Sequence, residues 1–116
     1  MSFTRADKVS GLIKKSLCDM LQKEISDPRL KLATITGVKM SPDLRLANVY
    51  FAISGGEKAK KEAVGGFKSA YGFIKKKMAQ RLGLRYMPDI RFYYDESFDY
   101  AARIEGLLDS VKTSDE

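Results

Sequence analysis

Lysine and arginine residues are concentrated between residues 57 and 85. Of all the residues in the sequence, these lysines and arginines are the strongest candidates for binding a ligand. The stretch holds nine of them against two glutamates, so its net charge of +7 exceeds the +6 of the whole 116-residue chain. Ammonium and guanidinium groups at this density attract phosphate groups. The stretch therefore predicts an anionic partner, with nucleic acid as the first expectation and a membrane surface as the second.

Apolar residues within this stretch recur three or four positions apart, which is the spacing of one helix face. The segment Ser69-Ala70-Tyr71-Gly72 interrupts the pattern, because glycine costs about 1 kcal/mol inside a helix and serine prefers the position before one. We therefore predict two helices that meet at a kink, the second beginning near Ser69 with free amide groups that could hold a phosphate. The predicted RNA-binding residues are the cations and kink residues of this region: Lys68, Ser69, Ala70, Tyr71, Gly72, Lys75, Lys76, Lys77, Arg81 and Arg85.

Plainer interpretations of the same region stay open. The run Lys75-Lys76-Lys77 is also typical of a solvated helix face, and Gly72 could serve only to let another backbone pack closely. Tyr50 and Tyr93 are expected on a sheet face away from the core, where they either stack on bases or simply cover the sheet. A smaller basic group near the start of the chain is predicted to form a secondary RNA-binding rim: Arg5, Lys8, Lys14 and Lys15.

Several classes of chemistry lack their residues in this sequence. The chain contains no histidine and a single cysteine, Cys18, so the commonest acid–base catalyst and the usual zinc ligand sets are missing. No glycine-rich phosphate loop of the Walker type occurs. We expect no enzyme activity, no cofactor, no metal and no small-molecule substrate.

The cysteine content and the hydropathy of the sequence also bear on the compartment in which the protein is found. A lone cysteine cannot form an internal disulfide, which favours a reducing compartment. No apolar run approaches the roughly 20 residues that span a bilayer, and the first residues lack the apolar segment of a signal peptide. The expectation is a cytoplasmic protein without a membrane segment.

The segments on either side of the basic stretch alternate between helical and strand patterns. Thr4 and Asp7 form a capping pair at the start of the first helix, and Asp27-Pro28 stops that helix because proline excludes the residue before it from helical conformation. The alternation of the first strand breaks at Gly37, which predicts a β-bulge. The predicted elements are a helix at 4–25, strands at 34–40 and 46–53 joined by a turn at 41–44, two basic helices between 57 and 82, a strand at 90–95 and a last helix from Ser97.

Glycines and element order complete the predicted architecture. Gly65-Gly66 inside the first basic helix either lets that helix fray or lets a neighbour approach closely, and Gly83 fits the C-cap of the second. The order αββααβα predicts a two-layer α+β domain, in which a three-stranded sheet carries its helices on one face. We expect a single domain over residues 1–112 and a flexible tail over residues 113–116.

Short motifs follow one another in a specific order along nearly the whole chain, up to Leu108. They are Arg5-Ala6-Asp7-Lys8-Val9, Asp27-Pro28-Arg29, Ser41-Pro42-Asp43-Leu44, Ala47-Asn48-Val49-Tyr50, Leu84-Arg85-Tyr86-Met87-Pro88, Phe92-Tyr93-Tyr94-Asp95-Glu96-Ser97 and Ala102-Arg103-Ile104. In this order and spacing the sequence resembles the ribosome-binding factor A family. The resemblance implies a type II KH-like fold in which an Ala-x-Gly kink, here Ala70-Tyr71-Gly72, replaces the nucleotide-gripping loop. It also implies binding to the immature 30S subunit and its 16S rRNA, support of late rRNA processing, and importance at low temperature.

The combined expectation is a monomeric, non-enzymatic ribosome assembly factor whose basic helices dock on structured rRNA. Lysine and arginine contacts to phosphates would supply affinity, and the amide groups of the kink would fix the register. Two alternatives stay open. One is a general single-stranded RNA-binding module that uses Tyr50 and Tyr93, and the other is a protein–protein adaptor whose acidic last helix meets a basic partner.

Overall fold

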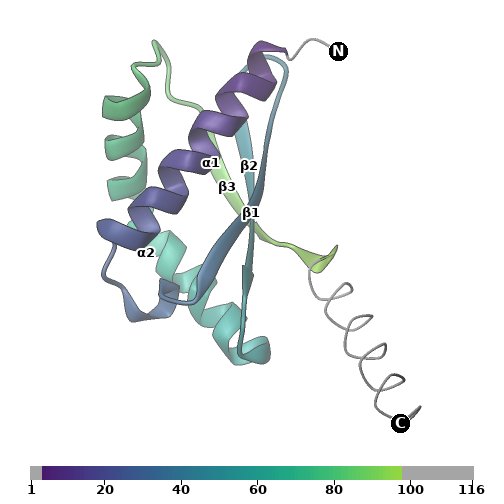
Figure 1. Cartoon of the computed structure of the whole chain (residues 1–116), viewed down its shortest axis with the longest axis vertical. Helices are drawn as coiled ribbons and strands as arrows, with labels where there is room; N and C mark the ends of the chain where they lie inside the picture. The colour runs from purple at the N-terminus through teal and green to yellow at the C-terminus, as the bar shows by residue number, and fades with distance from the viewer. Residues whose placement is uncertain (1–3, 98–116) are drawn as a thin grey trace, which may run out of the picture.

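The computed structural model of the chain describes residues 4–97, which fold into helices packed against a β-sheet (Figure 1). Its elements are, in order, α1 (Arg5–Lys23), the short 3-10 helix η1 (Pro28–Leu30), β1 (Ala33–Met40), β2 (Leu46–Ile53), α2 (Gly56–Leu82) and β3 (Asp89–Tyr94). The predicted last helix, apart from its first residue Ser97, and the predicted tail over 113–116 lie outside the described residues.

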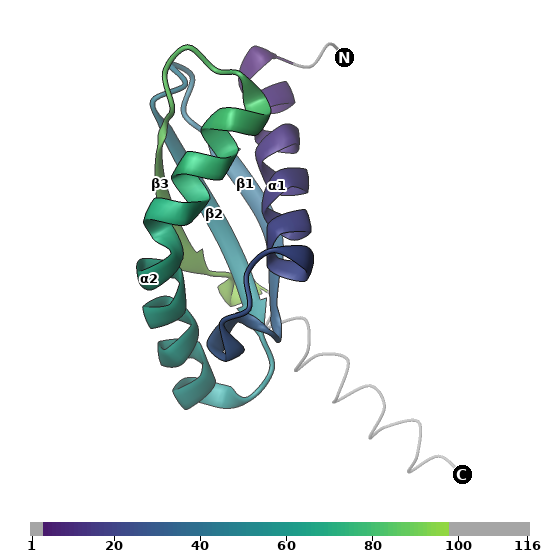
Figure 2. The same cartoon turned by 90° about the vertical axis from the view of Figure 1, so that its left-hand side faces the viewer.

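The three strands form one sheet in the order β1-β2-β3. β1 and β2 pair in antiparallel register, whereas β2 and β3 pair in parallel. A parallel pair needs a crossover connection, and α2 supplies it. Figure 2 shows α1 and α2 side by side over one face of the sheet. The prediction of an α+β fold, with a three-stranded sheet and its helices on one face, is confirmed.

The core lies between this face of the sheet and the two helices. Along β2 the alternating residues Ala47, Val49 and Phe51 are fully buried, as the sequence predicts for one face of a strand. Phe51 packs against Phe67 of α2, with ring centroids 4.9 Å apart. The largest fully buried side chains come from the sheet, from both helices and from η1: Ile13, Leu17, Met20, Leu30, Val49, Phe51, Phe67, Ile74 and Met78.

Local signals in the sequence locate several features correctly. The Thr4 hydroxyl accepts a hydrogen bond from the Asp7 amide and the Asp7 carboxylate accepts one from the Thr4 amide, both at 3.1 Å, so the capping pair is confirmed. The register of β1 against β2 shifts between Ile35 and Gly37, which confirms the bulge. Gly83 ends α2 in the left-handed conformation, with φ of 59°, as a glycine C-cap does.

The chain between α1 and β1 departs from the prediction. α1 ends at Lys23, slightly earlier than predicted, and residues 28–30 form η1, a short helix that is not predicted from the sequence. The Asp27 carboxylate accepts a hydrogen bond from the Arg29 amide at 2.9 Å and pairs with the Arg29 guanidinium at 2.7 Å. These hydrogen bonds hold the pKa of Asp27 below its ordinary value. Proline is common both at the first position of a helix and just after the end of one. Asp27-Pro28 therefore marks the start of η1 as well as a stop after α1.

The predicted kink does not divide the basic stretch into two helices. Residues 56–82 form the single, unbroken helix α2, whose axis changes direction near its middle (Figures 1 and 2). Ser69 therefore lies inside a helix, and its amide belongs to the helix's own hydrogen-bond pattern. The prediction of a second helix start with free amide groups is wrong. Phe67 and Ile74 on either side of Ser69 are both buried, and such tertiary packing outweighs the weak intrinsic preferences of serine and glycine.

Close packing explains the paired glycines of α2. A Cβ atom on Gly66 would lie 2.9 Å from Cγ of Leu30 in η1, whereas one on Gly65 would lie 3.4 Å from the guanidinium of Arg29. Leu30 is itself buried, so η1 packs against α2 at a position that has no room for a side chain. Of the two interpretations of Gly65-Gly66, the close approach of a neighbour is confirmed.

Candidate nucleic-acid interface

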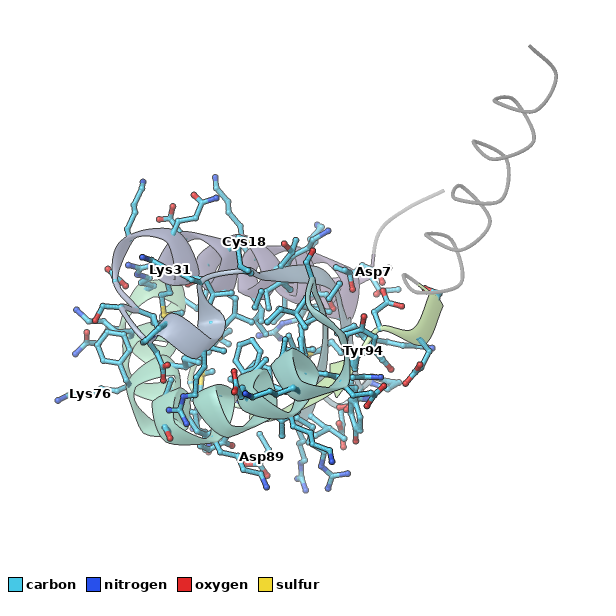
Figure 3. The ribbon with its side chains drawn as sticks, turned by 90° about the horizontal axis from the view of Figure 1, so that it is seen from below. Asp7, Cys18, Lys31, Lys76, Asp89 and Tyr94 are labelled. Atoms are coloured by element: carbon cyan, nitrogen blue, oxygen red, sulfur yellow. The ribbon has the colours of Figure 1, made fainter. Side chains whose placement is uncertain are left out.

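The basic residues of α2 do not share one surface. Because a helix turns by about 100° per residue, the consecutive residues Lys75, Lys76 and Lys77 project in three directions. Lys76 is exposed and extends away from the body of the protein (Figure 3), whereas Lys75 and Lys77 are half-buried. The predicted cluster therefore divides into cations that contact the protein and cations that face solvent.

Lys75 and Tyr71 fasten α2 to the start of β3. The Lys75 ammonium group lies 3.2 Å from a carboxylate oxygen of Asp89 and 5.5 Å from the centroid of the Tyr71 ring. The hydrogen bond to Asp89 raises the pKa of Lys75 above its ordinary value. The Tyr71 hydroxyl accepts a hydrogen bond from the Ile90 amide at 3.4 Å, and Ala70 and Tyr71 both pack against the core. These three predicted RNA-binding residues are thus engaged within the protein.

Arg81 holds α2 against α1. Its guanidinium forms an ion pair with the Glu24 carboxylate and lies 4.0 Å from a carboxylate oxygen of Asp19. Toward the start of α2, the Lys60 ammonium group lies 3.5 Å from a carboxylate oxygen of Glu96. The described acids near the basic stretch therefore pair with particular cations and leave the other cations of the stretch without an ion pair among residues 4–97.

The remaining cations of the predicted site form no ion pair with any described residue: Lys68, Lys76, Lys77 and Arg85. Ser69 and Gly72 are exposed near Lys68 and Lys76, and a Cβ atom on Gly72 would meet no atom within 4 Å. The Phe73 ring beside them is 41% exposed. We call this surface the outward face of α2, defined by Lys68, Ser69, Gly72, Phe73 and Lys76.

The predicted secondary rim lies on α1, beside α2 (Figure 2). Its members are exposed and form no ion pair among the residues that the structure describes: Arg5, Lys8, Lys14 and Lys15. Lys8 and Lys15 are about two turns apart and share a flank of the helix, whereas Lys14 projects about 100° away from Lys15. The helix thus brings together only part of the predicted rim.

A hollow that the sequence does not reveal lies where α1 begins, where α2 ends, and where the turn at 41–44 joins β1 to β2. It has a volume of about 810 Å³, and Arg5, Arg45, Arg85 and Tyr86 are among the residues that line it. These residues come from three separate segments, so each looks like an isolated surface residue in the sequence. Arg85 and Arg5 are predicted from the sequence as RNA contacts in two separate groups, but the sequence neither places them together nor singles out Arg45.

Tyr50 and Tyr93 lie on the sheet face away from the helices, as predicted. The two residues are partners in the parallel register of β2 and β3. Their ring centroids lie 5.9 Å apart and the rings are tilted by 31°. Tyr93 is 43% exposed.

Within residues 4–97, neither a metal centre nor a membrane segment is found. No group of three or more histidine, cysteine, aspartate or glutamate residues gathers closely enough there to hold a metal ion. None of the helices described there is both long and apolar enough to cross a bilayer. Cys18 is a free, half-buried thiol on α1.

Residues 5–108 match the sequence model of a family described as ribosome-binding factor A. A ribosome-binding factor A from Desulfatibacillum aliphaticivorans is 49% identical over 110 residues, which cover 95% of this chain and 89% of that protein. The match therefore extends over nearly the full length of both proteins.

Solved structures show the same fold. The crystal structure of ribosome-binding factor A from Thermus thermophilus superposes with a TM-score of 0.68 at 24% identity, over 78% of this chain and 97% of that one. A homology model of the Thermus thermophilus factor, fitted into an electron cryo-microscopy map of a complex with the 30S subunit, gives a TM-score of 0.62 at 25% identity, over 75% and 91% of the two chains. From this shared sequence and fold, the chain belongs to the ribosome-binding factor A family.

Proposed function

We propose that this protein is a ribosome assembly factor that binds the immature 30S subunit and its 16S rRNA in the cytoplasm, without catalysing a reaction. In this role it supports late rRNA processing and maturation of the small subunit, including at low temperature. It acts as a monomer on a type II KH-like scaffold, and the outward face of α2 docks on rRNA. Family membership and the 30S complex of the Thermus thermophilus relative support this proposal.

The unpaired lysines of the outward face carry the proposal. Lys68 and Lys76 are exposed and form no ion pair with any described residue. The side chains near them are small or apolar, namely Ser69, Gly72 and Phe73. No described acid competes for these two ammonium groups, so both remain available to phosphate groups of a partner.

Docking on this face exchanges condensed counterions for lysine contacts. Each phosphate that a lysine neutralises releases counterions, so affinity for the subunit falls as the salt concentration rises. Such contacts position a protein on nucleic acid but do not read its bases. Exposed glycine and serine on the outward face let the rRNA backbone come close to the helix.

Sedimentation with purified ribosomal particles tests the proposal. We expect the wild-type protein to travel with 30S subunits in a sucrose gradient and to be absent from 70S ribosomes. The double variant Lys68→Glu/Lys76→Glu should bind 30S subunits at least about 100-fold more weakly, because hydrogen bonds to charged groups contribute about 1.5–3 kcal/mol each. Circular dichroism should show an unchanged fold, since both side chains are exposed.

A control variant with the same change in net charge distinguishes an effect of the outward face on affinity from an effect of net charge alone. Lys31 and Lys39 are exposed lysines away from this face, and Lys31→Glu/Lys39→Glu changes the net charge by the same amount. This control should keep most of the affinity for 30S subunits. Equal losses in the two double variants, or unchanged binding of Lys68→Glu/Lys76→Glu at low salt, would contradict the assignment of the outward face.

The adjacent rings of Tyr50 and Tyr93 support a second candidate function, a general single-stranded RNA-binding module. Stacking of a base on an aromatic ring contributes about 1–3 kcal/mol, and these rings lie side by side on the sheet face opposite α1 and α2, where Tyr93 is 43% exposed. In this case Tyr50→Ala/Tyr93→Ala should weaken binding to an unstructured oligouridine more than Lys68→Glu/Lys76→Glu does. Fluorescence anisotropy with labelled RNA decides between the two candidates.

A further inference from the structure

Three arginines from separate segments line one hollow at an end of the molecule. Arg5 begins α1, Arg45 follows the turn at 41–44, and Arg85 lies in the connection between α2 and β3. The hollow measures about 810 Å³, within the range of about 300–1,000 Å³ that is typical of ligand sites. We call it the arginine pocket after these three residues.

The guanidinium groups of the arginine pocket remain available to a ligand. None of the three forms an ion pair with a described residue. Two carboxylates also line the pocket, but each is engaged. Asp43 accepts hydrogen bonds from the Ser41 hydroxyl at 2.6 Å and the Arg45 amide at 3.1 Å, and Asp89 pairs with Lys75 at 3.2 Å. Three guanidinium groups line the pocket against two carboxylates, of which Lys75 neutralises the one on Asp89, so the pocket keeps a net positive charge, which suits phosphate groups.

The pocket also has apolar parts that a phosphate alone would not need. Val9, Met40 and Leu84 line it, together with a tyrosine ring, Tyr86, that is 77% exposed. The Arg85 guanidinium lies 5.5 Å from the centroid of this ring. Proteins hold unpaired RNA bases on such aromatic rings and guanidinium planes, so the pocket offers partners for both parts of a nucleotide.

The turn that carries Arg45 into the pocket has an unusual backbone conformation. Leu44 has a φ of 62°, in the left-handed region that bulky side chains rarely adopt. Its amide donates a hydrogen bond to the Ser41 carbonyl at 2.9 Å, and Leu44 and Arg45 both line the pocket. Backbone strain of this kind clusters at binding sites, where surrounding contacts maintain it.

We propose that the arginine pocket holds one unpaired nucleotide of RNA, with the phosphates on its 5′ and 3′ sides bound by Arg5, Arg45 and Arg85 and its base stacked on Tyr86. This proposal rests on the proposed function, because the nucleotide belongs to the rRNA that the protein binds. The pocket adds a contact to an extruded nucleotide, which the outward face of α2 cannot make. RNA fits the pocket better than an acidic peptide does, because only RNA combines phosphate groups with a flat base for the ring.

Chemical probing of the 16S rRNA in 30S subunits tests this pocket. Acylation of ribose 2′-hydroxyls is measured with the wild type, Arg45→Gln, Tyr86→Leu and the control Lys31→Gln, which removes an exposed cation that lines neither the arginine pocket nor the outward face of α2. We expect both pocket variants to lose the change in reactivity at the same unpaired nucleotide and to keep the changes caused by α2. Each should bind about tenfold more weakly, and Arg45→Gln should reduce the slope of log affinity against log salt by about one.

The possible outcomes separate the pocket from the proposed function. If the wild type does not bind 30S subunits, the proposed function fails and the pocket fails with it. If the wild type binds and the pocket variants match its affinity and reactivity pattern, the pocket alone is overturned. A loss of affinity without any local change in rRNA reactivity would assign the pocket to a protein partner, which also overturns the proposal. Melting temperatures confirm that each exposed substitution leaves the fold intact.

Discussion

The inward and outward sides of α2 carry similar residues that serve different purposes. Phe67 on the inward side is 1% exposed, whereas Phe73 on the outward side is 41% exposed. Gly66 has Leu30 pressed against it, whereas Gly72 faces open space. Residue type alone therefore does not say whether a position of this helix contributes to folding or to binding, because its direction around the helix decides.

The same division applies to the neighbouring lysines of α2. Lys75 pairs with Asp89 and supports the contact with β3, whereas Lys76 has no described partner and extends into solvent (Figure 3). A cation that already has an acid beside it offers less to an approaching phosphate than an unpaired one does. Paired variants on the two sides of α2 can therefore test this division.

The two phenylalanines should show the largest contrast, in stability. Phe67→Ala is expected to lower the free energy of unfolding by about 4 kcal/mol, because it empties a buried position that stacks on Phe92 with centroids 4.4 Å apart. Phe73→Ala should cost less than about 1 kcal/mol, as exposed substitutions do. Urea denaturation measures both. Similar losses would show that the two sides of the helix are assigned wrongly.

Substitutions at the two adjacent glycines should have the next largest effects on stability, and these effects should have opposite signs. Gly66→Val is expected to lower the free energy of unfolding by about 2 kcal/mol, because its side chain would overlap buried Leu30. Gly65→Ala should raise stability by about 0.5–1 kcal/mol, since alanine is the better helix former and its Cβ atom would lie in ordinary van der Waals contact, 3.4 Å, with the Arg29 guanidinium. Thermal unfolding of the two variants provides the test, and a stable Gly66→Val would refute the close packing of η1.

The adjacent lysines should differ in affinity for 30S subunits. Lys76→Gln is expected to weaken binding about tenfold, or about 1.4 kcal/mol, through the loss of one charged contact. Lys75→Gln should weaken binding less than about threefold, because its ammonium group is already paired with Asp89. Titration of labelled protein with 30S subunits gives both values, and a larger effect at Lys75 would reverse the comparison.

Arg81 should show the smallest effect. Although its charge suggests an RNA contact, Arg81→Gln is expected to leave 30S affinity nearly unchanged, since the guanidinium pairs with Glu24. Stability should fall by about 0.5 kcal/mol, as is usual for a partly exposed ion pair. This difference should vanish in about 1 M salt, where charges are screened within about 3 Å. Melting temperatures at two salt concentrations check it.

The fold was largely predictable because its signals are local. The capping pair of Thr4 and Asp7, the alternation along β2 and the glycine at position 83 each depend on residues within a few positions. The predicted start of a second helix at Ser69 is wrong, because the weak helix preference of serine and glycine there is opposed by packing against the core. Buried Phe67 and Ile74 on both sides keep the helix continuous.

Periodicity and motif order were sufficient for the α+β class, the order of the elements and the basic character of one helix, since these depend on short-range pattern. Only the tertiary structure decided which cations remain unpaired and which residues meet in the arginine pocket. The reason is that ion pairs and cavities form across space. Lys75 and Asp89 are 14 positions apart in the chain, and Arg81 and Glu24 are 57 positions apart.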